Sequence, residues 1–199
     1  RRQRQMCIRD SITSGEGGMV FTDDEEIAKK CYELRNLCFQ KEKRFVHHKI
    51  GWNYRMTNIQ AALGLAQLEQ LKKFLIKKRE IGSIYNSILT EFDYLQLPLN
   101  ETKYAENIYW VYGIILKDNL KLTVSELMQK LAKKGIGTRP FFYPMHKQPI
   151  LNKMNIIMDS YYPISEKLSD RGFYLPSGLG LSTEKIPLIT EELINVINV

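Results

Sequence analysis

The segment from Ile50 to Leu71 constrains this chain more than any other, because it joins a polar turn to a long helical pattern. Thr57 stands three residues before Gln60, which is the spacing of a capping box at a helix N-terminus. Apolar side chains then recur at helical spacing, at Ile59, Ala62, Leu63, Ala66 and Leu71. We therefore predict a long helix that starts directly behind a polar tripeptide, Asn53-Tyr54-Arg55.

The polar tripeptide carries groups that suit a phosphate. The amide of Asn53 can donate hydrogen bonds to phosphate oxygens without adding charge, and the guanidinium of Arg55 can donate two in parallel. Each residue also has a structural interpretation: Asn53 as an Asx-turn before the helix, and Arg55 as a buried ion pair. The two residue types alone leave these interpretations open.

Helical and strand patterns alternate along the rest of the chain. In its first half they predict a strand at 19–22, a helix from Asp23 or Asp24 to about Arg35, a polar loop at 36–52, and a helix from Asn58 to about Phe92, bent near Gly82. In its second half they predict a strand at 109–116, a helix at 124–134 with a capping box at Thr123 and Glu126, a strand toward Phe142, a helix at 164–171, and a last helix at 184–196. Such alternation is typical of an α/β fold.

A second dense motif runs from Thr138 to His146, TRPFFYPMH. Its two prolines fix a loop from which Arg139, Tyr143 and His146 can project, as in a rigid pocket wall. The alternative is a loop whose aromatic side chains pack on the core, which would suit Phe141 or Phe142. A histidine taken alone is more often structural than catalytic.

Composition excludes several classes of function. Hydrophobic residues make up 44% and charged residues 26% of the 199 residues, as in ordinary globular proteins, and no apolar run is long enough for a membrane span. The net charge is +7, but the first ten residues hold four arginines and one aspartate, so the rest carries only +4, too little to favour nucleic acid. Three cysteines without metal-ligand spacing indicate a reduced, cytoplasmic protein. A metal site at His47 and His48 is not expected either, because adjacent histidines in a helix or strand cannot both face one metal ion.

The segment around Asn53 strongly resembles the signature GYNYRMTN-x-QAA-x-G-x-x-QL of the DegT/DnrJ/EryC1/StrS family, with Trp52 in place of a tyrosine. Members of that family are sugar aminotransferases that use pyridoxal 5'-phosphate (PLP). The resemblance begins at about Ser11 and covers the second half of a typical member. It implies a fragment of a fold-type I aminotransferase: residues 11–75 as the end of the large PLP domain, and residues 76–199 as the C-terminal small α/β domain.

The resemblance also implies roles for single residues. In the family, the asparagine at the position of Asn53 reaches the phosphate of the PLP held by the other subunit of a homodimer, and we assign Arg55 to the same phosphate. The run from Thr138 to His146 resembles the TRP-x-FYP-x-H run of the perosamine synthase branch, which lies near the nucleotide sugar. This implies contacts from Arg139, Tyr143 and His146 to a GDP-linked 4-keto-6-deoxy sugar, with glutamate as the amino donor.

One family residue is missing. The lysine that holds PLP covalently precedes the motif I-T-T-G-E-G-G in the family, and here Asp10 stands at its position before Ile12 to Gly18. A carboxylate cannot form that bond, so we expect the chain itself to be inactive. We interpret residues 1–10, RRQRQMCIRD, as a non-native leader that resembles translated sequencing-adapter DNA. The alternatives are a regulatory protein of the PLP fold and an inactive dimerisation module in which Asp10 is native.

Overall fold

The computed structural model describes residues 5–7, 11–40, 42–155 and 161–198. The chain divides into two compact units, Arg1–Phe74 and Leu75–Val199, here called the N-terminal and C-terminal units. Asp10 and most of the leader lie outside the described residues, so the hypothesis of a non-native leader stays a prediction. No described helix is long and apolar enough to cross a membrane.

The N-terminal unit is built around two capped helices. Strand β1 (Gln5–Cys7) pairs antiparallel with β2 (Gly18–Val20). Helix α1 (Glu25–Arg35) begins at Asp24, whose carboxylate accepts hydrogen bonds from two backbone N–H groups of the first turn. Helix α2 (Asn58–Leu68) begins at Thr57 with the complete capping box that the sequence predicts.

The long helix predicted from Asn58 to Phe92 is two helices. Helix α2 ends at Leu68, and α3 (Leu71–Leu89) follows after a tight turn at Glu69–Gln70. Helix α3 continues through Gly82, where the ring of Tyr109 packs on the helix, and the bend expected near Gly82 stays a prediction. A Cβ atom at Gly82 would lie 2.5 Å from that ring, so glycine at this position allows the ring to approach the helix backbone closely.

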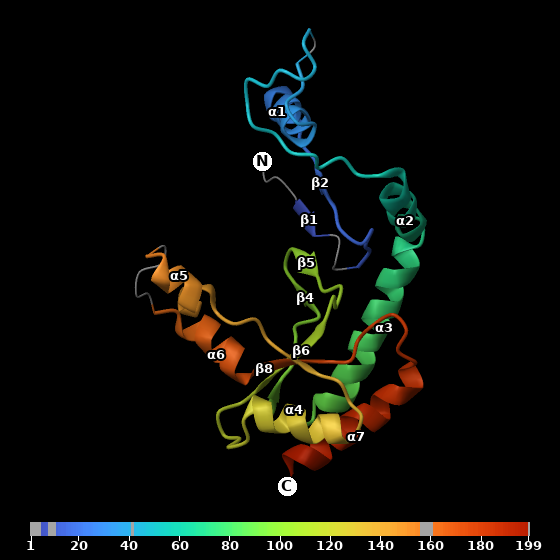
Figure 1. Ribbon diagram of the computed structural model, residues 1–199. Helices are drawn as coiled ribbons and strands as arrows, with labels where there is room; N and C mark the ends of the chain where they lie inside the picture. The colour runs from blue at the N-terminus through green and yellow to red at the C-terminus, as the bar shows by residue number, and fades with distance from the viewer. Residues whose placement is uncertain (1–4, 8–10, 41, 156–160, 199) are drawn as a thin grey trace. The chain divides into compact units, whose positions relative to one another are not determined.

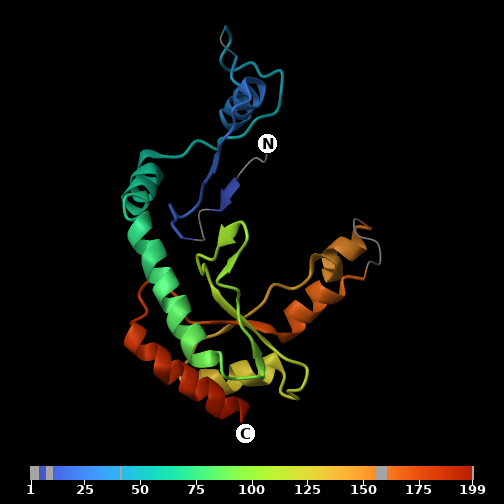
Figure 2. The same ribbon diagram turned by 180° about the vertical axis from the view of Figure 1, so that it is seen from behind.

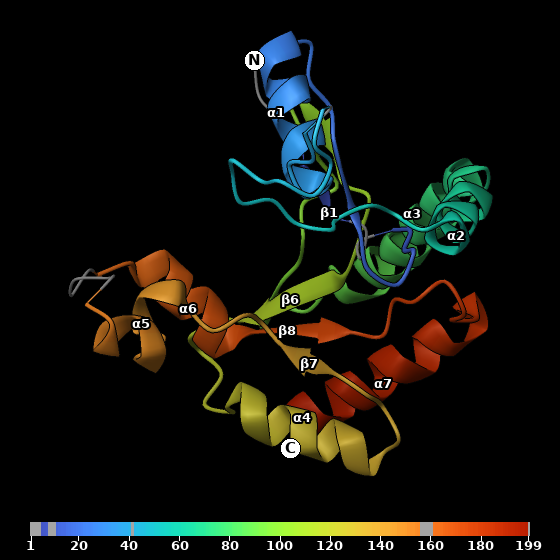
Figure 3. The ribbon, with the colours of Figure 1, turned by 45° about the horizontal axis from the view of Figure 1, so that its top comes forward.

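A four-stranded antiparallel sheet organises the C-terminal unit. Its strand order is β3-β6-β8-β7, with bounds Leu95–Gln96, Tyr112–Leu116, Gly172–Leu175 and Arg139–Pro140. Figure 3 shows β6, β8 and β7 side by side, with helices α4 (Val124–Lys133) and α7 (Ile186–Ile197) along one face. A small hairpin, β4 (Glu101–Thr102) and β5 (Ala105–Glu106), connects β3 to β6.

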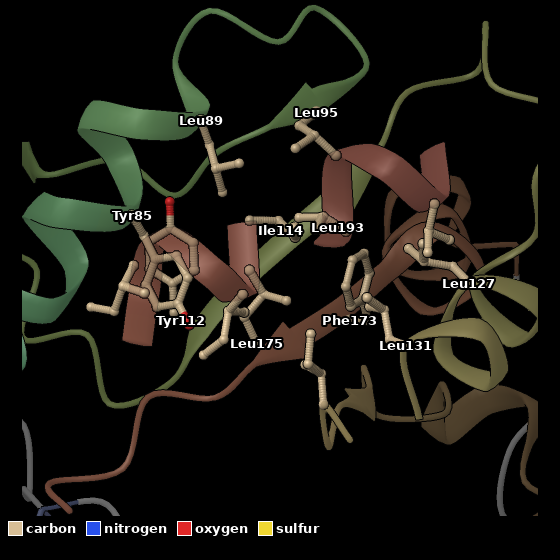
Figure 4. Packing of buried hydrophobic residues seen from close by; sticks show 14 of the residues in the cluster. Tyr85, Leu89, Leu95, Tyr112, Ile114, Leu127, Leu131, Phe173, Leu175 and Leu193 are labelled. Carbon is tan, nitrogen blue, oxygen red and sulfur yellow. The ribbon is translucent and has the colours of Figure 1, made fainter. Parts of the chain in front are cut away.

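The core of the C-terminal unit lies between this sheet and three helices. Alternate residues of β6 are buried, namely Tyr112, Ile114 and Leu116, as expected for a strand with one covered face. Side chains of α3, α4 and α7 meet them and Phe173 of β8 (Figure 4). The opposite views in Figures 1 and 2 agree that α7 runs beside α4.

Short helices occupy the connection from β7 back to β8. They are η1 (Met145–Lys147), α5 (Pro149–Lys153) and α6 (Pro163–Arg171), and η2 (Thr183–Lys185) precedes α7. Arg171, the last residue of α6, donates to the backbone carbonyls of Leu116, Lys117, Leu120 and Leu122. Its guanidinium is therefore bonded inside the fold and serves a structural role.

Candidate functional site

The segment from Trp52 to Arg55 is extended and sorts its side chains onto two faces. The rings of Trp52 and Tyr54 stack, with centroids 6.0 Å apart and planes 8° apart. Asn53 and Arg55 are also joined, since Arg55 Nε donates to Asn53 Oδ1 over 2.8 Å. Because side chains alternate along an extended chain, an aromatic face and a polar face result.

The polar face presents hydrogen-bond donors. The bond from Arg55 occupies the amide oxygen of Asn53, so the amide nitrogen of Asn53 is left to donate to other groups. Arg55 is exposed and forms no ion pair with any described residue, which does not match the buried ion pair considered from the sequence. A cluster that offers N–H groups and one positive charge is suited to an anion such as a phosphate.

Backbone hydrogen bonds hold this segment against the end of α1. Trp52 N donates to the carbonyl of Leu34 (2.7 Å), Tyr54 N donates to that of Arg35 (3.0 Å), and Asn53 forms an antiparallel bridge with Asn36. The cap of α2 follows at Thr57. The donors therefore project from a loop that is fixed at both ends.

The glycine turn that follows Asp10 is also fastened to α2. Gly15 and Gly17 have positive φ angles of 90° and 152°, which glycine tolerates best. Gln60 Nε2 donates to the carbonyl of Glu16 over 3.1 Å. The side chain of Gln67 bonds both backbone groups of Thr13. The motif at 12–18 is thus held by α2, whose N-terminal cap follows the motif at 53–55.

The second candidate loop lies in the C-terminal unit. Arg139 is exposed on β7, opposite Tyr174 of β8, and Tyr143 is 54% exposed. Phe141 instead stacks on Tyr174, with ring centroids 4.7 Å apart, and covers Gly172, as the packing alternative predicts. Phe142 remains 73% exposed.

His146 is held by a carboxylate that sequence reasoning missed. Its Nε2 lies 2.9 Å from Glu166 Oε1, and Lys147 Nζ lies 2.6 Å from Glu166 Oε2. The hydrogen bond from Lys147, and after it in size the one from His146, lower the pKa of the Glu166 carboxyl to about 2. An ionised carboxylate only accepts hydrogen bonds, so Nε2 of His146 carries a proton. Glu166 stands twenty positions away on another helix, and no local sequence signal pairs it with His146.

A cavity of about 550 Å³ adjoins this cluster. Aromatic side chains line much of it: Phe141, Phe142, Tyr161, Tyr162 and Tyr174. The ring of Tyr162 also packs edge-on against His146, with centroids 4.8 Å apart. The loop therefore forms one wall of an aromatic cavity whose other wall is α6.

The structure brings the predicted site residues together in two groups. Asn53 and Arg55 form one group in the N-terminal unit. Arg139, Tyr143 and His146 belong to the other, in the C-terminal unit, within one β7–η1 connection. Each group is formed by contacts inside its own unit.

A family model and several curated relatives match this chain. The model of the DegT/DnrJ/EryC1/StrS aminotransferase family matches residues 9–194. A GDP-perosamine synthase from Escherichia coli O157:H7 is 38% identical over 183 residues, which cover 92% of this chain and 48% of that protein. The chain spans about half the length of the curated relatives it matches.

Solved structures share the fold. Helicobacter pylori PseC, an aminotransferase of pseudoaminic acid biosynthesis, superimposes with a TM-score of 0.84 at 24% identity, over 94% of this chain and 50% of PseC. An E. coli GDP-4-keto-6-deoxy-D-mannose-3-dehydratase with bound hydrated PLP gives 0.77 at 20% identity, over 95% and 53%. The fold is thus the α/β fold of sugar aminotransferases, and the chain belongs to the DegT/DnrJ/EryC1/StrS aminotransferase family.

Proposed function

We propose that this chain is the C-terminal part of a PLP-dependent nucleotide-sugar aminotransferase. The parent enzyme moves an amino group from glutamate to a 4-keto-6-deoxy sugar linked to GDP, as a homodimer with shared active sites. Similarity to the E. coli GDP-perosamine synthase supports the sugar and the nucleotide. Residues 11–75 then complete the large domain, and residues 76–199 form the small domain.

The donor pair of Asn53 and Arg55 carries this proposal. Its free amide nitrogen and its single positive charge fit the phosphate of PLP, which is a small dianion. Bound PLP supplies an electron sink through which an amino group can leave one substrate and join another. The part of this chain is to hold the cofactor phosphate of the neighbouring subunit.

The loop from Arg139 to His146 is assigned to the sugar nucleotide. Exposed Arg139 and Tyr143 offer a positive charge and a phenol to a phosphate or a sugar hydroxyl. The Nε2 proton of His146 is used in the bond to Glu166, and the ring packs against Tyr162, which lines the cavity. Its Nδ1 has no partner among the described residues and is left to accept a hydrogen bond from a ligand.

A chimera tests the proposal directly. Residues 11–199 would replace the matching half of the E. coli GDP-perosamine synthase, so that the relative supplies its own lysine. We expect the chimera to bind PLP and to aminate the 4-keto sugar nucleotide with glutamate as donor. A chimera that folds and binds PLP without aminating this substrate would show that the sugar or the nucleotide is wrongly assigned.

Asp10 favours a second candidate, a PLP-fold regulatory or dimerisation protein without transaminase activity. A second chimera that carries Asp10 at the lysine position should fold but should not transaminate. Reading the genomic codons upstream of Ser11 separates the two candidates. A lysine codon there supports the enzyme, and codons for RQMCIRD support the regulatory or dimerisation protein that lacks the lysine.

A further inference from the structure

The loop between α1 and α2 contains a pocket that neither motif explains. Its volume is about 390 Å³, within the roughly 300–1,000 Å³ usual for small-molecule sites. The lining residues are Leu37, His47, His48, Lys49, Ile50 and Gly51, all within the N-terminal unit. The loop itself is cyan in Figure 1.

The floor of this pocket is rigidly built. Leu37 and Cys38 have positive φ angles of 61° and 48°, a conformation that costs free energy in residues other than glycine. Hydrogen bonds hold them there, from Leu37 N to the carbonyl of Trp52 (3.0 Å) and from Cys38 N to that of Glu33 (2.9 Å). Gly51 lies so close that a Cβ atom would be 2.7 Å from Cys38 N. Strain maintained by so many contacts is typical of functional sites.

The two histidines of the pocket differ in the hydrogen bonds that their rings form. His47 Nδ1 lies 2.8 Å from the carbonyl oxygen of Leu37, which can only accept, so Nδ1 carries the proton and His47 is fastened to the wall of the pocket. Phe39 packs against the ring of His47, with centroids 5.5 Å apart. His48 is exposed and has no hydrogen bond or ion pair within the described part of the chain.

The charge of the lining is positive. Lys49 is 71% exposed and lies 3.7 Å from the carboxylate of Glu33, a pair too open to neutralise it fully. A metal ion does not suit this lining, because the described residues contain no group of three or more histidine, cysteine or acidic side chains placed to hold one. The ammonium of Lys49 and the imidazole N–H of His48 favour an anion instead.

We propose that this pocket binds the diphosphate group of a nucleotide, through His48 and Lys49. The segment Gly51 to Asn53 connects this pocket to the donors assigned to the cofactor phosphate, so two anion sites follow each other along one fixed segment. The choice of a nucleotide rests on the proposed function, whereas the diphosphate site rests on the pocket alone.

Binding of anions to the 199-residue chain tests this site without any need for PLP or activity. Pyrophosphate, GDP and inorganic phosphate would be titrated by calorimetry. We expect pyrophosphate and GDP to bind more tightly than phosphate. The variants His48→Gln and Lys49→Gln should each weaken the binding of pyrophosphate and of GDP by about ten-fold or more, because each removes a donor or a charge.

Two further variants sharpen the test. Glu33→Gln should tighten binding, because it removes the carboxylate that competes for Lys49. Lys103→Gln, on the exposed β4–β5 turn, is the matched control and should change nothing. No saturable binding, equal affinity for phosphate and pyrophosphate, or indifference to His48 and Lys49 would each overturn the inference. The chimera can still aminate its substrate in any of these cases, so the two proposals fail separately.

Discussion

Replacing Asn53 by alanine in the chimera should weaken PLP binding by about ten- to a hundred-fold. The amide oxygen of Asn53 is occupied by Arg55 Nε at 2.8 Å, so only the amide nitrogen is available to the phosphate, with one or two N–H bonds. Hydrogen bonds to charged groups contribute roughly 1.5–3 kcal/mol, which corresponds to that loss of affinity. Absorbance titration of the apo-chimera with PLP measures it.

The isosteric variant Asn53→Asp separates donation from packing. The carboxylate keeps the bond to Arg55 but replaces the donors with a negative charge beside a dianionic phosphate. It should therefore bind PLP more weakly than Asn53→Ala does. Asn152→Ala, an exposed asparagine of α5, is the control and should leave the affinity unchanged. An Asp variant that binds PLP as well as the parent would refute the role of Asn53 as a phosphate donor.

Mixed dimers test whether Asn53 acts on the neighbouring subunit. One subunit would carry Asn53→Ala with an intact lysine, and the other would carry Asp10 with an intact Asn53. If the contact crosses the dimer, one of the two sites has both functional groups and activity returns in part. Mixed dimers that form but stay inactive would show that Asn53 acts within its own subunit or not at all.

Three other predictions follow from the fold. No residue of α2 is buried in this chain, although the helix is largely apolar. The chimera should therefore sediment as a dimer or a larger oligomer. A strict monomer at micromolar concentration would contradict the shared site. Phe173→Ala should cost about 3–5 kcal/mol of unfolding free energy in denaturant melts, since Phe173 is fully buried, whereas Phe142→Ala should cost about 0.5 kcal/mol or less. The folded pKa of Glu166 lies below its ordinary 4.5, so its stabilising contribution is complete above about pH 4.5 and is lost toward about pH 2. The melting-temperature difference between the parent and Glu166→Gln should therefore shrink over that range, and a constant difference would contradict the ion cluster.

Helix ends were predictable because they depend on neighbouring residues. The capping boxes at Thr57 and Thr123 are both complete, and Gly135 has the positive φ of 76° that ends α4. Pro187 lies in the first turn of α7, where its missing N–H has no partner to lose. In each case two to four residues decide the outcome, so a single sequence is sufficient.

Features that depend on distant contacts were not predictable in the same way. The sequence did not show that the ring of Tyr109 packs on α3 in the space that Gly82 leaves. The strand predicted from Tyr109 starts only at Tyr112, and Tyr109 itself has a φ of 47°. The short strands β3 to β5 have too few residues to show a period. Glu166 could not be linked to His146, because α5 and the residues up to α6 separate them in the chain.

The scaffold and the candidate sites differ in whether their polar side chains find hydrogen-bond partners within the chain. Lys78 is buried, which lowers its pKa, and its ammonium donates to the carbonyl of Ser177 over 2.6 Å. Tyr112 OH likewise donates to Asn86 Oδ1 over 2.6 Å, deep in the C-terminal unit. The amide nitrogen of Asn53 and both ring nitrogens of His48 have no such partners among the described residues, although the backbone around them is firmly bonded. Asn53 and His48 are exposed, so water bonds to these nitrogens until a ligand replaces it, and their N–H groups are available to an anion.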